Sequence, residues 1–525
     1  MPSSRSLVAS LLLLSVVWAG TAHAEAPPPA MVGRIATAAG GVSLRPAGGE
    51  WGDSALNDPV ASGMALRTSA GGRAALGIGA RMVTLSGGSE LDIARLDDGV
   101  LQIALRQGRI GVHVARLDSG ETVEIDLSRG GLWLLAPGDY DIIAGNEQSP
   151  ARVAVFDGRA RFVGDGADAT VMAGSALVVN GKGPVSETIE AAKADNFVAA
   201  WRPPPGDPVA PAALRYVSPG MTGWDMLDAN GSWETLADLG AAWCPTSLPE
   251  DWAPYRYGHW RWVMPWGWSW IDDMPWGFAP SHYGRWARVN ERWGWVPGDR
   301  AAPPVYAPAL VDFLGTAGVG LSYPDATGPA VAWFPLAPGE VYWPSYTTAL
   351  DAIRRLNAGA VEDVTKIGAG IDGEPPGDLI TAPYQNRRFA SVVPRSVFVG
   401  GRAVAPALVQ LPEPRLENAP LLPGSPQIGP PAPRPVVLGG RPTLAHAVTT
   451  LARILSARPT TTAARTVILR PSRHGWWQPK AQARAVFTAR VARSAQRARA
   501  YTAAAYGRSS RLRTHFAAAG RGRLH

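Results

Sequence analysis

The chain has 525 residues, 46% of them hydrophobic, which is long enough for two or three domains with separate cores and excludes a small disulfide-stapled scaffold. Its net charge of +7 is unevenly distributed, because 18 Lys and Arg and no acidic residue follow Glu417, leaving 32 basic against 43 acidic residues before that point. The single cysteine, Cys244, cannot form an intrachain disulfide; the sequence predicts a buried, inert thiol, with pairing to another chain as the alternative.

Residues 1–24 have the pattern of a secretory signal peptide. Arg5 gives a basic start, about 14 mostly apolar residues follow from Leu7, and Ala22-His23-Ala24 supplies a small-residue cleavage site. An uncleaved membrane anchor is disfavoured, because the apolar run is shorter than the ~20 residues that cross a bilayer. We therefore expect an exported, periplasmic protein that begins at Glu25.

Residues 33–184 are predicted to form one all-β domain. Short runs of alternating or β-branched residues, such as RIGVHV at 109–114 and TVEIDL at 122–127, recur between glycine and aspartate turns without helical periodicity between them. Paired glycines, as at Gly40-Gly41, allow the positive φ angles that tight connections need. This pattern predicts a sandwich, a roll or a solenoid.

The same region resembles the FecR domain family. The matching segments are Leu66-Arg67-Thr68, Arg73-Ala74-Ala75-Leu76, the stretch at 108–114, Gly138-Asp139-Tyr140-Asp141-Ile142 and the stretch at 153–160. The resemblance implies a β-rich periplasmic roll or sandwich, which in transmembrane members relays an outer-membrane transport signal to a sigma factor. With an export signal in place of a cytoplasmic segment, we expect no direct contact with a sigma factor.

A linker is predicted over 185–215, with a short helix at 187–200 and a proline-rich end at 202–208. A second domain is predicted over 216–400. It contains an internal repeat, in which Tyr257-Gly258-His259-Trp260 and Tyr283-Gly284-Arg285-Trp286 are each followed by a Trp-Gly-Trp segment. We expect each unit to be a β-hairpin, turning at 264–265 and at 290–291, with a fainter copy at 240–243.

The stretch WRWVMPWGWSW at 260–270 places five tryptophans in eleven residues. Because residues two apart share one face of a strand, a hairpin here would gather the five indoles on one face and leave Arg261, Ser269 and other small or polar residues on the opposite face. The pattern favours a core row, with a ligand platform for sugars as the alternative. The candidate ligand-binding residues are Trp260, Trp262, Trp266, Trp268, Trp270, Trp293, Trp295, His259 and His282.

The second domain also resembles an uncharacterised family that follows FecR domains in exported bacterial proteins. The resemblance covers residues 224 to about 346 and includes Trp252-Ala253-Pro254-Tyr255-Arg256, Trp276-Gly277-Phe278-Ala279-Pro280, the stretch at 282–286, the stretch at 304–311 and the stretch at 333–340. It implies no activity, because the family has none to carry over.

The sequence offers no convincing catalytic or metal site. Asp272 and Asp273 are adjacent, so in a strand they face opposite sides and cannot act as a carboxylate pair across one bond. His259 and His282 lack further ligands at metal-site spacing, so we expect structural roles for both rings. We predict no enzymatic activity, no metal and no cofactor.

Residues 401–525 are predicted to be a proline-rich linker followed by a basic, Ala- and Arg-rich tail of low complexity. A solvated, disordered tail and a tether to anionic surfaces are both open. The sequence thus predicts an exported cell-envelope interaction or sensing module, with a glycan-binding or glycan-processing protein as the alternative. An envelope protein, a glycan or lipopolysaccharide would be the partner; nucleic acid is disfavoured by the location.

Overall fold

A computed structural model describes residues 28–430, except 98, 165, 182–186, 203–210, 237, 316–328, 369–374, 378, 380–382, 423, 425 and 427. The predicted signal peptide and nearly all of the predicted basic tail lie outside the described residues. In the described ranges, no helix has the length and hydropathy that a membrane span requires.

The N-terminal domain is a sandwich in which the described residues form two nine-stranded sheets around one core. The first sheet has the order β18 (Glu187–Ala191), β17 (Ser175–Val179), β14 (Ala151–Asp157), β13 (Gly138–Ile143), β10 (Arg109–Val114), β7 (Arg81–Leu85), β6 (Arg73–Ile78), β1 (Gly33–Ala39) and β4 (Pro59–Val60). The second has the order β16 (Ala167–Met172), β15 (Arg159–Gly164), β12 (Gly130–Leu134), β11 (Thr122–Leu127), β9 (Val100–Gln107), β8 (Glu90–Asp97), β5 (Ala65–Thr68), β2 (Val42–Arg45) and β3 (Gly52–Asp53).

Side-chain alternation explains these strands. In β11, Val123, Ile125 and Leu127 are buried, whereas the residues between them are half-buried, as a strand with one face on the core requires. The predicted mainly-β class is confirmed, and within the alternatives for this domain the structure selects a sandwich.

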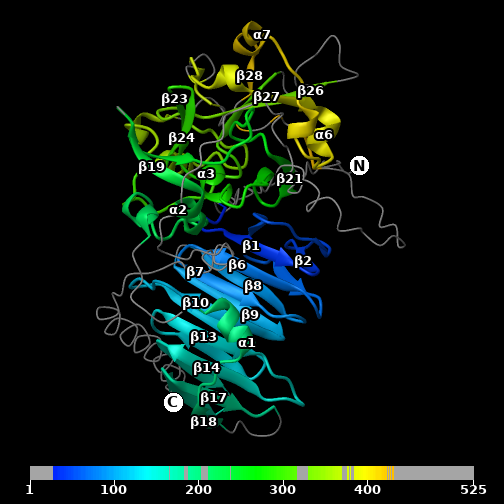
Figure 1. Cartoon of the computed structure of the whole chain (residues 1–525), viewed down its shortest axis with the longest axis vertical. Coiled ribbons are helices and arrows are strands. Elements are labelled where there is room, and N and C mark those ends of the chain that lie inside the picture. The colour runs from blue at the N-terminus through cyan, green and yellow to red at the C-terminus, as the bar shows by residue number, and fades with distance from the viewer. Residues whose placement is uncertain are drawn as a thin grey trace, which may run out of the picture.

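The helix predicted over 187–200 is wrong for its first residues. Residues 187–191 form β18, which pairs with the open edge of β17; its Thr188 and Ile189 are β-branched and favour a strand. Helix α1 (Asn196–Trp201) follows and lies on the outer face of the first sheet (Figure 1), with Asp195 as its N-cap. Gly111 lies beneath the Trp201 indole, where a Cβ would overlap the ring.

The second domain contains a four-stranded sheet, a separate hairpin and another four-stranded sheet among the described residues. In sheet order, its strands are β19 (Gly231–Leu236), β20 (Gly240–Pro245), β24 (Arg292–Val296) and β23 (Arg285–Val289); β21 (Gly258–Val263) and β22 (Gly267–Asp272); and β27 (Ser391–Pro394), β26 (Ala330–Pro335), β25 (Val311–Leu314) and β28 (Leu421–Leu422). Its short helices are α2 (Leu227–Asn230), α3 (Phe278–His282), α4 (Leu350–Asn357), α6 (Arg395–Val399) and α7 (Glu413–Glu417).

Both predicted repeat hairpins are present. Strands β21 and β22 pair Trp260 with Trp270 and Trp262 with Trp268. Strands β23 and β24 turn through Asn290 and Glu291, whose positive φ angles of 49° and 60° match a two-residue hairpin turn. The fainter copy is a hairpin as well, because β20 pairs with β19 and joins β24 through Trp243 and Trp295.

Two details of the tryptophan hairpin differ from the prediction. Trp266 lies in the turn before β22, so the paired strands carry four of the five indoles. The face opposite the indoles is not open: Ser269 is fully buried, and the Arg261 guanidinium reaches Asp58 of the sandwich. The prediction of a one-sided core is wrong, because Ser269 on this second face is buried and Arg261 contacts the other domain.

The predicted boundary at residue 400 is also too early. Helix α7 packs beside residues 387–389, and β28 pairs with β25, so this proline-rich stretch completes a sheet of the second domain. Proline spacing predicts an extended chain but cannot reveal the strand edge that receives it.

The second domain covers the end of the sandwich formed by β1 and β2, as Figure 1 shows with the green and yellow domain above the blue strands. One hydrophobic cluster runs from the sandwich, including Val32, into the second domain, including Met221 and Trp224. The two domains therefore share a core at their junction.

Candidate functional site

Most of the predicted ligand-binding indoles are core residues. The buried members are Trp260, Trp266, Trp268, Trp270, Trp293 and Trp295. Trp260 contacts four aromatic rings, at centroid distances of 5.2 to 5.6 Å, and the Trp268 and Trp295 indole nitrogens donate to the buried carbonyls of Ile428 and Tyr283. Trp262 differs, because it is only half-buried.

Of the two candidate histidines, His282 is enclosed by protein and His259 is half-buried. His282 lies between Phe278 and Tyr306, its Nδ1 is 2.8 Å from the Ala307 carbonyl oxygen, and burial lowers its pKa to about 3. His259, on β21, has its pKa lowered to about 4 by burial and by the positive charge of Arg261. Both rings are therefore neutral at pH 7.

A buried polar network joins the two domains. Arg34 of β1 donates from Nη2 to both carboxylate oxygens of Asp225, at 3.1 and 2.8 Å, and both side chains are almost completely buried. The Asn57 amide donates to the carbonyls of Asp272 and Met274, at 2.9 and 2.8 Å. Buried groups of this kind are satisfied only in one relative placement of the domains, so the network fixes the junction.

The N-terminal segment belongs to the same junction. The Thr222 hydroxyl donates to the Val32 carbonyl at 2.7 Å, and the Tyr306 N–H donates to the Ala30 carbonyl at 2.9 Å. The chain entering β1 is thus held by two separate parts of the second domain.

Beside this network, a second ion pair crosses the junction. The Arg261 guanidinium donates to Asp58 at 2.6 Å, and the Asp58 carboxylate is fully buried. Burial raises the pKa of Asp58, and the positive charge of Arg261 opposes that shift. The pair forms one wall of an interdomain cleft.

This cleft has a volume of about 280 Å³, close to the smaller ligand pockets of proteins. The sandwich and strand β21 both contribute to it. It is lined by Leu44, Pro46, Glu50, Gly52, Asp53, Asp58, Pro59, Met64, Arg261, Trp262 and Val263.

The turn that carries Glu50 and the short strand β3 that carries Asp53 are anchored at Trp51. The Arg67 and Arg45 guanidinium groups lie over this indole, 4.2 and 4.9 Å from the ring centroid. Such cation–π contacts hold the Trp51 ring in place. The cleft therefore combines two carboxylates, apolar walls and the half-buried Trp262 indole, an arrangement that suits a ligand with both an apolar face and hydroxyl or cationic groups.

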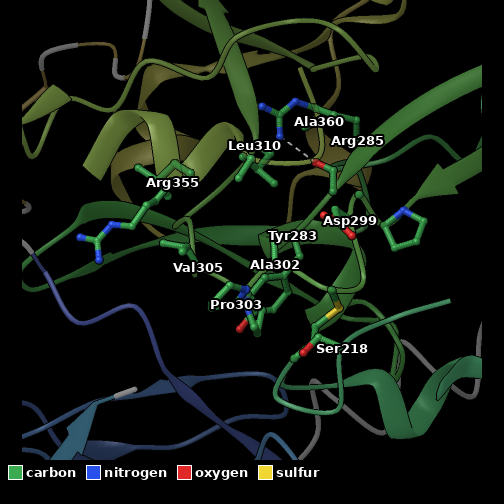
Figure 2. Close-up of a pocket in the computed structure, with 17 residues that line it drawn as sticks. Ser218, Tyr283, Arg285, Asp299, Ala302, Pro303, Val305, Leu310, Arg355 and Ala360 are labelled. Carbon is green, nitrogen blue, oxygen red and sulfur yellow. Dashed lines mark hydrogen bonds between the residues drawn. The ribbon is translucent and has the colours of Figure 1, made fainter. Parts of the chain in front are cut away.

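A second, smaller cavity lies within the second domain (Figure 2). Ser218, Tyr283, Asp299 and Val305 line it, and its volume of about 40 Å³ leaves room for a water molecule. Arg285 lies at its edge, fully buried, and donates to the carbonyls of Glu340 and Gly284 and to the Asn357 amide oxygen. This guanidinium supports the fold, and the cavity is too small for an organic ligand.

Asp312, on β25, is a buried carboxylate without a hydrogen bond of standard geometry among the described residues. Burial raises its pKa to about 7, although the Gly424 N–H and the Tyr384 hydroxyl nearby act in the opposite direction. Burial also raises the pKa of Asp272 to about 7. Both groups gain protons in the folded state at a pH where the unfolded chain has lost them.

We expect the buried carboxyl group of Asp312 to stabilise the protein increasingly as the pH falls from 8 to 5, while the buried neutral rings of His259 and His282 act in the opposite direction below about pH 6.5, where the unfolded rings bind protons. Because the folded pKa of Asp312 exceeds the unfolded value of ~3.9, its contribution is complete below about pH 4 and is lost as the pH rises through 7. Asp312→Asn is expected to remove the Asp312 part of the slope of stability against pH, up to about 1 kcal/mol per pH unit, whereas Asp272 and Asp273, whose pKa values burial raises to about 7 and about 6, keep their parts. Urea denaturation at pH 5, 6, 7 and 8 measures it. Asp351→Asn, at an exposed position, is the control; equal slopes in the two variants would contradict the assignment.

Sequence reasoning found Trp262 but missed the other half of the cleft. Glu50, Asp53 and Asp58 lie about 200 residues before β21, and only the domain junction brings them together. The Gly-Gly-Glu-Trp-Gly-Asp stretch at 48–53 was the available signal, because an acidic glycine-rich turn around a tryptophan is unusual beside a strand.

Within the described ranges, no cluster of three His, Cys, Asp or Glu side chains could hold a metal ion. Cys244 is buried, as predicted, and burial raises its pKa.

Comparison with known proteins found a family match for part of the chain. Residues 224–340 match the model of a family of unknown function, DUF6600, which agrees with the resemblance of the second domain. A search of curated proteins found no match. Two crystal structures of a "putative anti-sigma factor" from Parabacteroides distasonis are similar over 26% of this chain and 63% of that protein, with 15% and 16% identity and TM-scores of 0.24 and 0.23. The chain thus spans less than two thirds of that protein, and a similarity this weak carries no argument.

Proposed function

We propose that this chain is an exported, non-catalytic interaction or sensing module of the cell envelope, and that the interdomain cleft is its ligand site. The observation that carries the proposal is the cleft itself, whose walls come from both domains. A ligand there contacts the sandwich through Glu50 and Asp53 and the second domain through Trp262. A bound ligand would therefore contact both domains at the same time.

The resemblance of the sandwich to FecR domains supports a role in the periplasm. Its matching segments fall on β5, β6, β10, β13, β14 and β15, so they follow the strand framework in chain order. The predicted signal peptide at residues 1–24 supports the same location. An envelope protein, a glycan or lipopolysaccharide is the expected partner, the basic tail adds attraction to anionic surfaces, and direct sigma-factor contact is not part of the proposal.

Glycan binding is the second candidate, and Trp262 favours it. This indole lines the cleft while the other indoles of the hairpin are buried or lie in the turn. Sugar rings stack their C–H faces on indoles, and carboxylates such as Glu50 and Asp53 accept hydrogen bonds from hydroxyl groups.

Trp262→Ala is expected to weaken binding of the cognate glycan about tenfold or more, because stacking on one aromatic ring contributes about 1–3 kcal/mol. Isothermal titration calorimetry with peptidoglycan fragments and with lipopolysaccharide measures the affinity. Trp233→Ala is the matched control, since Trp233 is also half-buried but stacks on Tyr216 outside the cleft.

Three results would count against these assignments. Absence of saturable binding of both ligands to the wild-type chain would remove the glycan candidate. Equal losses in Trp262→Ala and Trp233→Ala would remove the cleft as its site. Release of reducing ends or stem peptides during incubation with peptidoglycan would overturn the non-catalytic assignment.

A further inference from the structure

The size of the interdomain cleft limits its ligand. Its volume of about 280 Å³ lies just below the usual range of ligand pockets. Its lining comes from short segments of both domains, within residues 44–64 and 261–263. A ligand of one or two sugar rings fits this space, whereas a folded domain or a long chain segment does not.

The lining of the cleft is negatively charged. It contains three carboxylates, of Glu50, Asp53 and Asp58, against one guanidinium, that of Arg261, which leaves a formal charge of −2. Arg261 pairs with Asp58, and among the described residues Glu50 and Asp53 enter no ion pair. Such a lining attracts a cation and repels phosphate and carboxylate groups, and the apolar walls strengthen both effects.

Two basic neighbours of the cleft do not reverse this charge. The Arg67 and Arg45 guanidinium groups lie over the Trp51 indole and are not part of the lining. Arg67 is opposite Glu90 in the pairing of β5 with β8, and Arg45 contacts the Asp92 carboxylate at 3.4 Å. These acidic partners offset much of the two positive charges, so the free carboxylates of the lining keep the cleft negative.

The apolar part of the lining favours a ring-shaped ligand. The walls include Leu44, Met64 and Val263 beside the half-buried Trp262 indole. Trp262 is held edge-to-face by Trp268, with ring centroids 5.6 Å apart and an interplanar angle of 89°. An indole fixed in this way binds the C–H face of a sugar ring and also attracts a nearby ammonium group.

We propose that the ligand of this cleft is an amine-bearing sugar, that is, a glycan unit whose amino group is free and protonated. Its ring stacks on Trp262, and its ammonium group donates charge-assisted hydrogen bonds to Glu50 and Asp53. A sugar with an acetylated amine lacks the charge, and a phosphorylated sugar is repelled by the same carboxylates. The inference rests on the proposed function, because it names the class of ligand for the proposed site.

Two disaccharides of equal ring number test this class of ligand. They are the β-1,4-linked dimer of glucosamine and its diacetylated form, and each is titrated calorimetrically into the full chain at pH 6, where the amines are protonated. We expect the wild-type chain to bind the free-amine dimer about tenfold more tightly than the diacetylated dimer, and the ratio of affinities to fall in 0.5 M salt, because salt screens the carboxylates.

A pair of variants assigns the selectivity to the cleft. Glu50→Gln combined with Asp53→Asn is expected to bring the ratio of affinities near one and to leave the affinity for the diacetylated dimer unchanged, because both amides still accept hydrogen bonds from hydroxyl groups. Glu147→Gln combined with Asp351→Asn is the matched control. It removes two exposed carboxylates outside the cleft, changes the net charge equally, and is expected to keep the wild-type ratio.

Equal affinity of the wild-type chain for the two disaccharides would overturn the inference, as would an equal loss of selectivity in the control variant. If the Glu50 and Asp53 variant does not fold, a wild-type ratio that stays constant in 0.5 M salt would overturn it as well. Tighter binding of the diacetylated dimer that Trp262→Ala weakens would reject the amine class alone and keep the cleft as a glycan site. Absence of saturable binding of either disaccharide, of peptidoglycan fragments and of lipopolysaccharide would reject both the inference and the proposed ligand site.

Discussion

Asp225→Asn is expected to lower the free energy of unfolding by about 3–5 kcal/mol, because it leaves the Arg34 guanidinium buried at the domain junction without its counter-charge. Arg34 and Asp225 come from different domains, so the loss is expected in the unfolding of the whole assembly. Urea denaturation of the full chain, followed by circular dichroism and by tryptophan emission, measures it.

Two further variants test the reason for this loss. Arg292→Gln, which removes an exposed ion pair with Glu234, is expected to cost less than about 1 kcal/mol. Arg34→Met combined with Asp225→Leu replaces the buried pair by apolar groups and is expected to recover much of the single-variant loss. A double variant as unstable as the sum of its single changes would show that the loss comes from packing, not from an unpaired charge.

Trp260→Ala is expected to cost about 3–5 kcal/mol, the range found for removing large aromatic side chains from cores. Trp260 is 1% exposed, and its ring contacts those of Trp270, Phe313, Trp333 and Phe398. These partners come from four elements, so the cavity left behind cannot close by the movement of one strand.

Trp262→Ala is the comparison, because the two residues lie two positions apart on one strand. Trp262 is half-buried, and we expect its removal to cost less than half as much while reducing ligand affinity. The urea denaturation midpoints of the two variants, measured at equal protein concentration, compare the two losses of stability. A larger loss for Trp262→Ala would contradict the division of the row into core and cleft residues.

Local patterns predicted much of this fold. Alternation located the strands of the sandwich, and the spacing of tryptophans and glycines located both repeat hairpins and their turns. The helix expected at 187–191 failed because the free edge of β17 decides the conformation there, and no pattern within those residues reports that edge.

The site was less predictable for a related reason. The indole row gave Trp262, but alternation assigns Trp260 and Trp262 to the same face of β21 and cannot show that one is fully buried and the other half-buried. The polar face of β21 and β22 reads as a solvent-facing surface, since Arg261 and Ser269 are polar; their partners lie far away in sequence, as with Asp58, 203 residues before Arg261. Pairing at such separations leaves no trace in a single sequence.

The Arg34 and Asp225 pair also constrains the order in which the chain can mature. The two residues are separated by 191 positions, and the N-terminal one is made first. At synthesis rates of about 5–20 residues per second, Arg34 waits roughly 10–40 s for its partner. During that interval the end of the sandwich is an incomplete surface with an unmatched cation and apolar residues such as Val32. The second domain is therefore synthesised after the sandwich and then covers its open end. The sandwich is most exposed to misassembly before the second domain has folded onto it.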